Sequence, residues 1–249
     1  MPKMTLLAIT QDILSDMNSD EVNSINDTPE SLQVAQIVKT TYYEIIDGGE
    51  WPHLRRIMPL DALGDLTHPN YMKLPADVNK IYTIKYDCKK AGGTYSEYKT
   101  ITYLEPLDFL DYVMNRKSND SSVDIITDFS GVGLFIMNDV APTYYTSFDD
   151  EYIVFDAYNS GIDTTLQSSK SQIYVKRVPT WTHDDSFYPD LPPESFSLLV
   201  AEAKSTCFNS IKQMPNQKEE QKANRQRRKI TPKKSRVSEE FTFKSFGRK

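Results

Sequence analysis

Two acidic clusters contain the residue types that could bind a metal ion or catalyse a hydrolysis. Asp149-Asp150-Glu151 is a run of carboxylates, and His183-Asp184-Asp185 places an imidazole beside two more. These groups are ligands for divalent cations. Both clusters nevertheless lie beside turn-forming residues, and neither has the spacing of a known metal motif. We therefore expect no metal site, and we keep the second cluster as the one to test for an enzyme.

The remaining residues with catalytic or cofactor-binding potential form no recognisable signature. His53, His68 and His183 lie near proline or aspartate, and none has a matching serine or cysteine nucleophile motif. Cys88 and Cys207 are far apart and have no C-x-x-C neighbour. Glycine occurs only nine times, without a G-x-G-x-x-G or Walker-type loop. We expect surface histidines, reduced buried thiols, no cofactor and no enzymatic activity.

The strongest signal is the charge at the end of the sequence. Residues 222–249 contain eleven Lys/Arg against two Glu, a net charge of +9. Because the whole sequence carries −6, the rest of it must carry −15. The candidate electrostatic contacts are Arg225, Arg227, Arg228, Lys229, Lys233, Lys234 and Arg236. Such a segment can neutralise nucleic-acid phosphates, dock on an acidic protein surface, or remain solvated. Composition alone does not separate these three alternatives.

Beyond the cations, apolar and polar residues alternate from Phe241 to Phe246, which suits an added β-strand. The candidate docking residues are Phe241, Phe243, Lys244, Phe246 and Arg248. The expected positioning element is therefore an extended C-terminal arm over residues 230–249.

Two stretches near the start of the sequence have helical periodicity. Thr5 is the expected N-cap of a first helix, and Thr28-Pro29 is a start signal for a second. The apolar stripe of the first helix is Leu6, Ile9, Ile13, Leu14 and Met17. The stripe of the second is Val34, Ile37, Val38, Thr41 and Ile45, before Gly48-Gly49. The two are expected to form a helical hairpin or to be members of a bundle.

The middle of the sequence has the alternation of β-strands. A hairpin is expected from Ile81–Cys88 and Lys99–Leu104, with a turn at Lys89–Gly93. A short helix should follow Pro106, with Leu107, Leu110, Val113 and Met114 as its apolar residues. Further strands are expected at Val123–Phe129, Val132–Met137, Tyr152–Ala157 and Ile173–Val178. Their spacing predicts an antiparallel sheet or sandwich.

Helical periodicity returns after Pro192-Pro193 and continues to Pro215, and residues 216–229 are helix-prone but nearly without apolar side chains. We therefore predict an α+β fold: a helical bundle formed by the N- and C-terminal segments, with an inserted, sandwich-like antiparallel β domain. The expected divisions are 1–58 and 188–229 for the helical domain, 59–187 for the β domain, and the arm. No apolar run approaches the roughly 20 residues needed to span a bilayer, so we expect no membrane partner.

Three stretches together carry a family resemblance. The first is Ser19–Ile25 with Gln33–Lys39 and Trp51-Pro52; the second is Asp156–Lys170; the third is Pro192-Pro193-Glu194 with Leu199–Phe208. They resemble the head-to-tail adaptor proteins of short-tailed bacteriophages, also called tail tubular protein A or head-tail connectors. The resemblance covers most of the sequence except its last 20 residues, and its motifs are structural rather than catalytic.

The resemblance implies a structural virion protein at the head-tail junction, made in the host cytoplasm. It implies a homo-oligomeric ring of twelve copies that binds the portal protein and joins it to the tail nozzle protein, with genome DNA passing through without sequence-specific contact. In the family the C-terminal arm reaches into the portal. An acidic body would repel the phosphates in the channel, and a basic arm would find the portal. The alternative is a non-enzymatic nucleic-acid-binding protein that uses the basic C-terminal segment.

Overall fold

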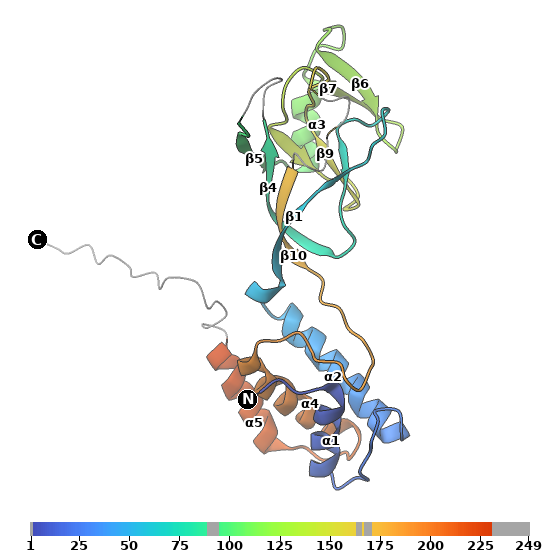
Figure 1. The fold of residues 1–249 in the computed structure, drawn as a ribbon, viewed down its shortest axis with the longest axis vertical. Helices are drawn as coiled ribbons and strands as arrows, with labels where there is room; N and C mark the ends of the chain where they lie inside the picture. The colour runs from blue at the N-terminus through green and yellow to red at the C-terminus, as the bar shows by residue number, and fades with distance from the viewer. Residues whose placement is uncertain (1, 89–94, 163–165, 167–170, 231–249) are drawn as a thin grey trace, which may run out of the picture. The chain divides into compact units, whose positions relative to one another are not determined.

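The computed structural model describes residues 2–88, 95–162, 166 and 171–230 (Figure 1). In this part the chain is mixed α+β, with five α-helices and a large, mostly antiparallel sheet. It divides into two compact units: a helical unit, formed by the chain up to His53 and from Pro179 onward, and a β unit, Leu54–Val178. Compared with the predicted divisions, residues 54–58 fall in the β unit and residues 179–187 in the helical unit.

The first two helices begin where the sequence predicts. Helix α1 is Leu6–Asp16, and the Thr5 hydroxyl accepts a hydrogen bond from the Ala8 amide at 3.1 Å. Helix α2 is Pro29–Asp47, and Thr28 and Ser31 form a reciprocal capping box at its start. Both caps satisfy backbone N–H groups that a helix start leaves without partners. Both predicted N-caps are therefore confirmed.

The second part of the helical unit contributes η3 (Pro193–Ser195), α4 (Phe196–Ser210) and α5 (Gln217–Ile230). Helix α4 packs against α1, α2 and α5. Its Lys204 side chain is 8 % exposed, and the ammonium group lies 2.8 Å from an Asp12 oxygen and 2.5 Å from an Asp16 oxygen, both on α1. This ion triad ties the two sequence-distant parts of the unit together.

The segment before η3 is anchored in the same unit. The Trp181 ring lies 5.2 Å from Tyr42 of α2 and 4.8 Å from Phe187. The Asp185 carboxylate accepts a hydrogen bond from the Ile25 amide at 2.8 Å. Aromatic packing and this polar contact explain why the helical unit begins again at Pro179 rather than at residue 188.

The β unit contains one eight-stranded sheet in the order β1-β10-β4-β5-β8-β9-β3-β2 and a two-stranded sheet, β6-β7. The strands are β1 Arg55–Pro59, β2 Asp61–Ala62, β3 Tyr71–Lys73, β4 Val78–Asp87, β5 Tyr98–Tyr103, β6 Val123–Thr127, β7 Gly133–Met137, β8 Tyr144–Thr146, β9 Tyr152–Phe155 and β10 Ser171–Arg177. All strand pairs are antiparallel except β5 with β8. The short helix η1, Pro52–Leu54, leads into β1.

The predicted β4-β5 hairpin is confirmed by its register, in which Ile84 lies opposite Ile101, whereas its predicted turn lies outside the described residues. Helix α3, Pro106–Met114, is also where it was expected, and its apolar residues differ in burial. Phe109 and Val113 are fully buried, while Leu107 is 77 % exposed. The buried pair has the i, i+4 spacing of one helix face, and the first-turn leucine lies off that face.

The core of the β unit is aliphatic and aromatic, with one buried ion pair beside it. The Asp156 side chain is 4 % exposed and accepts a hydrogen bond from Arg116 at 3.1 Å. Its other carboxylate oxygen accepts hydrogen bonds from the Thr143 and Tyr144 amides, each at 2.8 Å. Asp156 therefore joins α3's C-terminal flank to strands β8 and β9. Among the described helices, none combines the length and apolar character needed to cross a membrane.

Candidate functional site

Helix α5 carries the part of the basic segment that the structure describes. The Asn216 side chain accepts a hydrogen bond from the Glu219 amide at 3.3 Å and so caps its start. Glu219 and Glu220 lie in the first turn, while arginines and a lysine fill the last part of the helix. Negative charge at the N-terminus and positive charge at the C-terminus both interact favourably with the helix dipole. This charge order explains why a helix with so few apolar residues forms.

One side of α5 is fixed to α4. Ala223 is 5 % exposed, which makes it the buried point of the contact. The Arg227 guanidinium donates to one Glu202 oxygen at 2.6 and 3.0 Å. Because Arg227 is 61 % exposed, this ion pair contributes no more than about 1 kcal/mol. Arg227 thus positions the helix, and it is less available to a partner than the sequence suggests.

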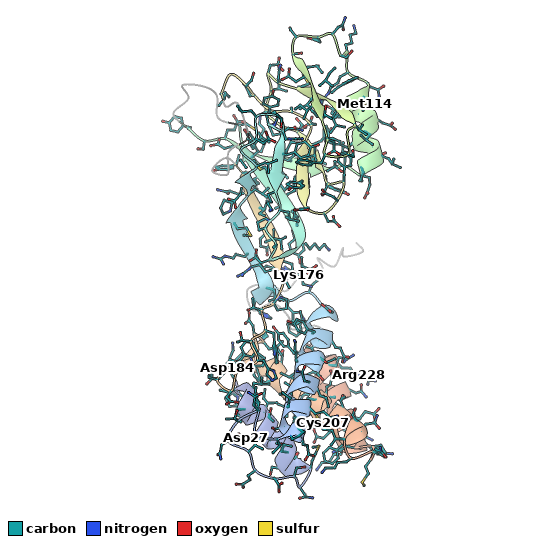
Figure 2. All side chains as sticks on the ribbon, turned by 90° about the vertical axis from the view of Figure 1, so that its right-hand side faces the viewer. Asp27, Met114, Lys176, Asp184, Cys207 and Arg228 are labelled. Carbon is teal, nitrogen blue, oxygen red and sulfur yellow. The ribbon has the colours of Figure 1, made fainter. Side chains whose placement is uncertain are left out.

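The other described cations of α5 face solvent. Lys218, Lys222, Arg225 and Arg228 are all exposed, and Arg228 is labelled in Figure 2. Lys222 also pairs with Glu219 at 3.0 Å within the helix. Lys229 lies in the helix, but its side chain is outside the described residues. Also outside them are Lys233, Lys234, Arg236, Phe241, Phe243, Lys244, Phe246 and Arg248.

The acidic clusters have structural roles. Asp149 caps a turn by accepting from the Glu151 and Tyr152 amides at 2.9 Å. Hydrogen bonds from the side chain and amide of Ser186 lower the pKa of Asp184 below its usual value. Across residues 2–88, 95–162, 166 and 171–230, no three His, Cys, Asp or Glu side chains gather as a metal site would require.

The histidines and cysteines follow the predictions only in part. His53 and His183 are exposed, but the His68 ring stacks on Phe129 with centroids 4.3 Å apart, and its side chain is 15 % exposed. Cys207 is buried, and burial raises the pKa of its thiol to about 12. Cys88 is half-buried and also free. A thiol with such a raised pKa is a poor nucleophile near neutral pH.

A hollow of about 320 Å³ lies beside β3, β7 and β9. Most of its lining is apolar, including Leu110, Phe129 and Leu134. The Asp128 carboxylate at its edge accepts hydrogen bonds from Tyr71 at 2.7 Å and from Ser130 at 2.6 Å. Asp149, the other acid in the lining, accepts hydrogen bonds from two turn amides, so both carboxylates of the hollow already have partners.

A second positive region, not predicted from the sequence, lies on adjacent strands of the large sheet. β1, β10 and β4 contain six Lys/Arg and one Asp, a net charge of +5. Arg55 lies opposite Lys176, which lies opposite Lys80 in turn. The Arg55 guanidinium and the Lys80 ammonium both lie over the Tyr82 ring, 5.2 and 5.6 Å from its centroid. The only sequence signals were the separate pairs Arg55-Arg56 and Lys176-Arg177, which pairing across more than 100 residues brings together.

Comparison of the sequence with models of known protein families and with characterised proteins found no match.

Proposed function

We propose that this protein is a non-enzymatic structural adaptor of a virion, which docks on the portal protein at the head-tail junction through its basic C-terminal arm. The proposal includes a homo-oligomeric ring, of twelve copies by the resemblance, that joins the portal to the tail nozzle and surrounds the path of the genome. It also takes the helices of the N- and C-terminal segments to be one bundle that carries the β unit.

The observation that carries the proposal is the way α5 leads into the arm. Its buried Ala223 and its Arg227–Glu202 pair hold the helix on α4, while Arg225 and Arg228 face solvent. A helix fixed at its base reduces the conformational entropy that a following segment loses on docking. The nineteen residues after Ile230 contain the alternating phenylalanines of the arm. Because α5 is fixed on α4, the segment that follows it starts from a defined position. The alternation of apolar and polar residues in that segment suits the addition of a strand to the edge of a partner's sheet.

Deletion of Thr231–Lys249 tests the docking role. We expect the truncated chain to fold as the full chain does, since it keeps both buried cores described above, and to lose binding to the portal ring. Sedimentation velocity of purified protein mixed with the portal ring, after nuclease treatment, measures the complex. Truncated protein that binds the portal with undiminished affinity would refute the proposal.

A matched pair of variants separates the arm's side chains from its charge. Phe241→Ser with Phe243→Ser keeps every charge and should abolish docking if the phenylalanines enter a partner sheet. Lys233→Gln with Lys234→Gln keeps every phenylalanine and should weaken docking only at low salt, because screening already reduces exposed charge pairs. Undiminished docking by the phenylalanine pair, with a loss only in the lysine pair, would indicate that the arm binds by net charge alone.

Nucleic-acid binding is the second candidate function, favoured by the exposure of Arg225 and Arg228 on α5. It predicts duplex binding that weakens steeply with salt. Truncation after Gln221 should abolish that binding, whereas truncation after Ile230 should keep part of it. Fluorescence anisotropy with a labelled duplex over a salt series measures both. Absence of duplex binding by the full chain at low salt excludes this function.

A further inference from the structure

The charge of the β unit is strongly polarised. The unit has thirteen Lys/Arg against seventeen Asp/Glu, a net charge of −4. β1, β4 and β10 carry +5 and the remainder of the unit carries −9; of the six cations, Lys176 is buried and Arg177 pairs with Asp77. Figure 1 shows these three strands side by side at one end of the sheet order, as the pairing requires. A unit divided in this way can attract a second unit of the same kind.

The positive side is a surface with both cations and apolar groups. Arg55, Lys80 and Tyr82 are in contact through the two cation–π pairs, and the Tyr174 ring lies 5.4 Å from Tyr82. Ile57, opposite Tyr174 in the register, is 69 % exposed. Lys85 is exposed on the same face and lies opposite Gln172. We name the surface formed by these residues the basic sheet face: Arg55, Ile57, Lys80, Tyr82, Lys85 and Tyr174. Lys176 of β10, labelled in Figure 2, is buried and is left out of this surface.

The negative side includes a second mixed surface, built from the end of β5, the start of α3 and the β8-β9 turn. Leu107 is 77 % exposed, Tyr103 46 % and Phe148 38 %. The Tyr103 hydroxyl donates a hydrogen bond to Glu105 at 3.4 Å, and partial burial with the negative charges of Glu105 and Asp150 raises its pKa. Phe148 contacts Phe109 of α3 with ring centroids 6.2 Å apart, which joins the turn to the helix. We name this surface the acidic surface: Tyr103, Glu105, Leu107, Asp108, Phe148 and Asp150.

We propose that the basic sheet face of one copy binds the acidic surface of the next copy, in a head-to-tail contact between β units. The contact is heterologous, because each copy uses two different surfaces, and it repeats until the ring closes. The inference deepens the proposed function and rests on it for the closed ring. The two surfaces match in charge and in their exposed apolar side chains.

A second copy fits these observations better than nucleic acid does. A duplex on the basic sheet face would still meet the field of a unit that is negative overall, in a chain of net charge −6. Contact with phosphates does not stabilise the exposed Ile57 and Leu107 side chains. Contact with another protein does, because it removes their apolar surface from water. A protein partner can therefore interact with both the charges and the exposed apolar side chains of each surface.

Reciprocal charge reversal tests the contact. Variant A carries Lys80→Glu and Lys85→Glu; variant B carries Glu105→Lys and Asp108→Lys. Asp150 is left unchanged because its φ of 59° disfavours most other residues. Each variant alone should self-associate about 100-fold more weakly than the native chain, since like charges then face each other. A 1:1 mixture should associate again, because each of its two alternating contacts joins opposite charges.

Sedimentation velocity of the full chain at low salt gives the readout, with circular dichroism to establish that each variant is folded. Lys117→Glu with Lys218→Glu is the control for net charge, because both lysines are exposed outside the two surfaces. Native chain that stays monomeric up to about 100 µM overturns the inference. A 1:1 mixture of variants A and B that remains dissociated also overturns it. A third contrary result would be duplex binding by the native chain that variant A has lost. Portal binding is measured separately, so its failure bears on the proposed function, while failed mixing bears on this contact.

Discussion

Removal of the Asp156 carboxylate should destabilise the β unit more than a typical substitution. Asp156 and Arg116 are 4 % and 11 % exposed, so the variant Asp156→Ala leaves a nearly buried guanidinium without its counter-charge. Breaking a buried pair in this way costs about 3–5 kcal/mol. The amides of Thr143 and Tyr144 also lose their acceptor. Thr143 is exposed and can bind water instead, so its contribution to the loss is small.

Two further variants make the estimate specific. Asp156→Asn keeps an oxygen for the two amides and removes the charge, so it should lose about half as much as Asp156→Ala, roughly 1.5–2.5 kcal/mol. Asp139→Ala is the control, because Asp139 is exposed and its substitution should change stability by no more than about 0.5 kcal/mol. The expected loss of stability is therefore largest for Asp156→Ala, intermediate for Asp156→Asn and smallest for the control.

Urea unfolding measured by near-ultraviolet circular dichroism of tyrosine follows mainly the β unit, which contains twelve of the fifteen tyrosines. Tryptophan fluorescence follows the helical unit, since Trp51 and Trp181 both belong to it. The expected result is a lower midpoint in the tyrosine signal with an unchanged slope. A loss below about 1 kcal/mol for Asp156→Ala would refute the assignment of the pair as a buried, structure-bearing contact.

Two predictions concern the helical unit. Lys204→Met should cost about 1–3 kcal/mol, less than a fully buried pair, because Asp12 and Asp16 are 39 % and 49 % exposed and regain water. Burial lowers the Lys204 pKa, but its hydrogen bonds to both aspartates outweigh burial and hold the pKa above 10.5. The ammonium therefore stabilises the fold below that pH, and the native advantage should shrink as pH rises through the folded-state pKa. Tryptophan-monitored urea unfolding checks this, and an advantage that grows with pH contradicts it. Thr28→Ala should cost about 1 kcal/mol through the lost N-cap, while Thr28→Ser should cost little. Equal losses for the two would contradict a capping role.

Sequence patterns predicted the elements whose signals are local. Thr28-Pro29 predicts a helix start from the local sequence, because the capping box joins residues only three apart, Thr28 and Ser31. The β4-β5 hairpin was equally local. The partners of β1 and the position of Arg116 were not predictable in the same way, because Arg55 pairs with Lys176 and Arg116 with Asp156 through tertiary contacts. The short strands β2, β3 and β8 are too brief for alternation to be recognised.

The same limit applies to charge. A sum along the sequence finds the basic segment from Lys222 onward, since its cations lie close together in the sequence, but it averages those of β1, β4 and β10 with the acidic loops between them. Sheet pairing sorts these strands to one end of the order and leaves the carboxylates of α3 and the β8-β9 turn elsewhere. Polarity within the β unit is thus a product of topology. An acidic average is compatible with a strongly attractive face, so a net charge of −15 before Lys222 does not by itself imply that copies repel one another.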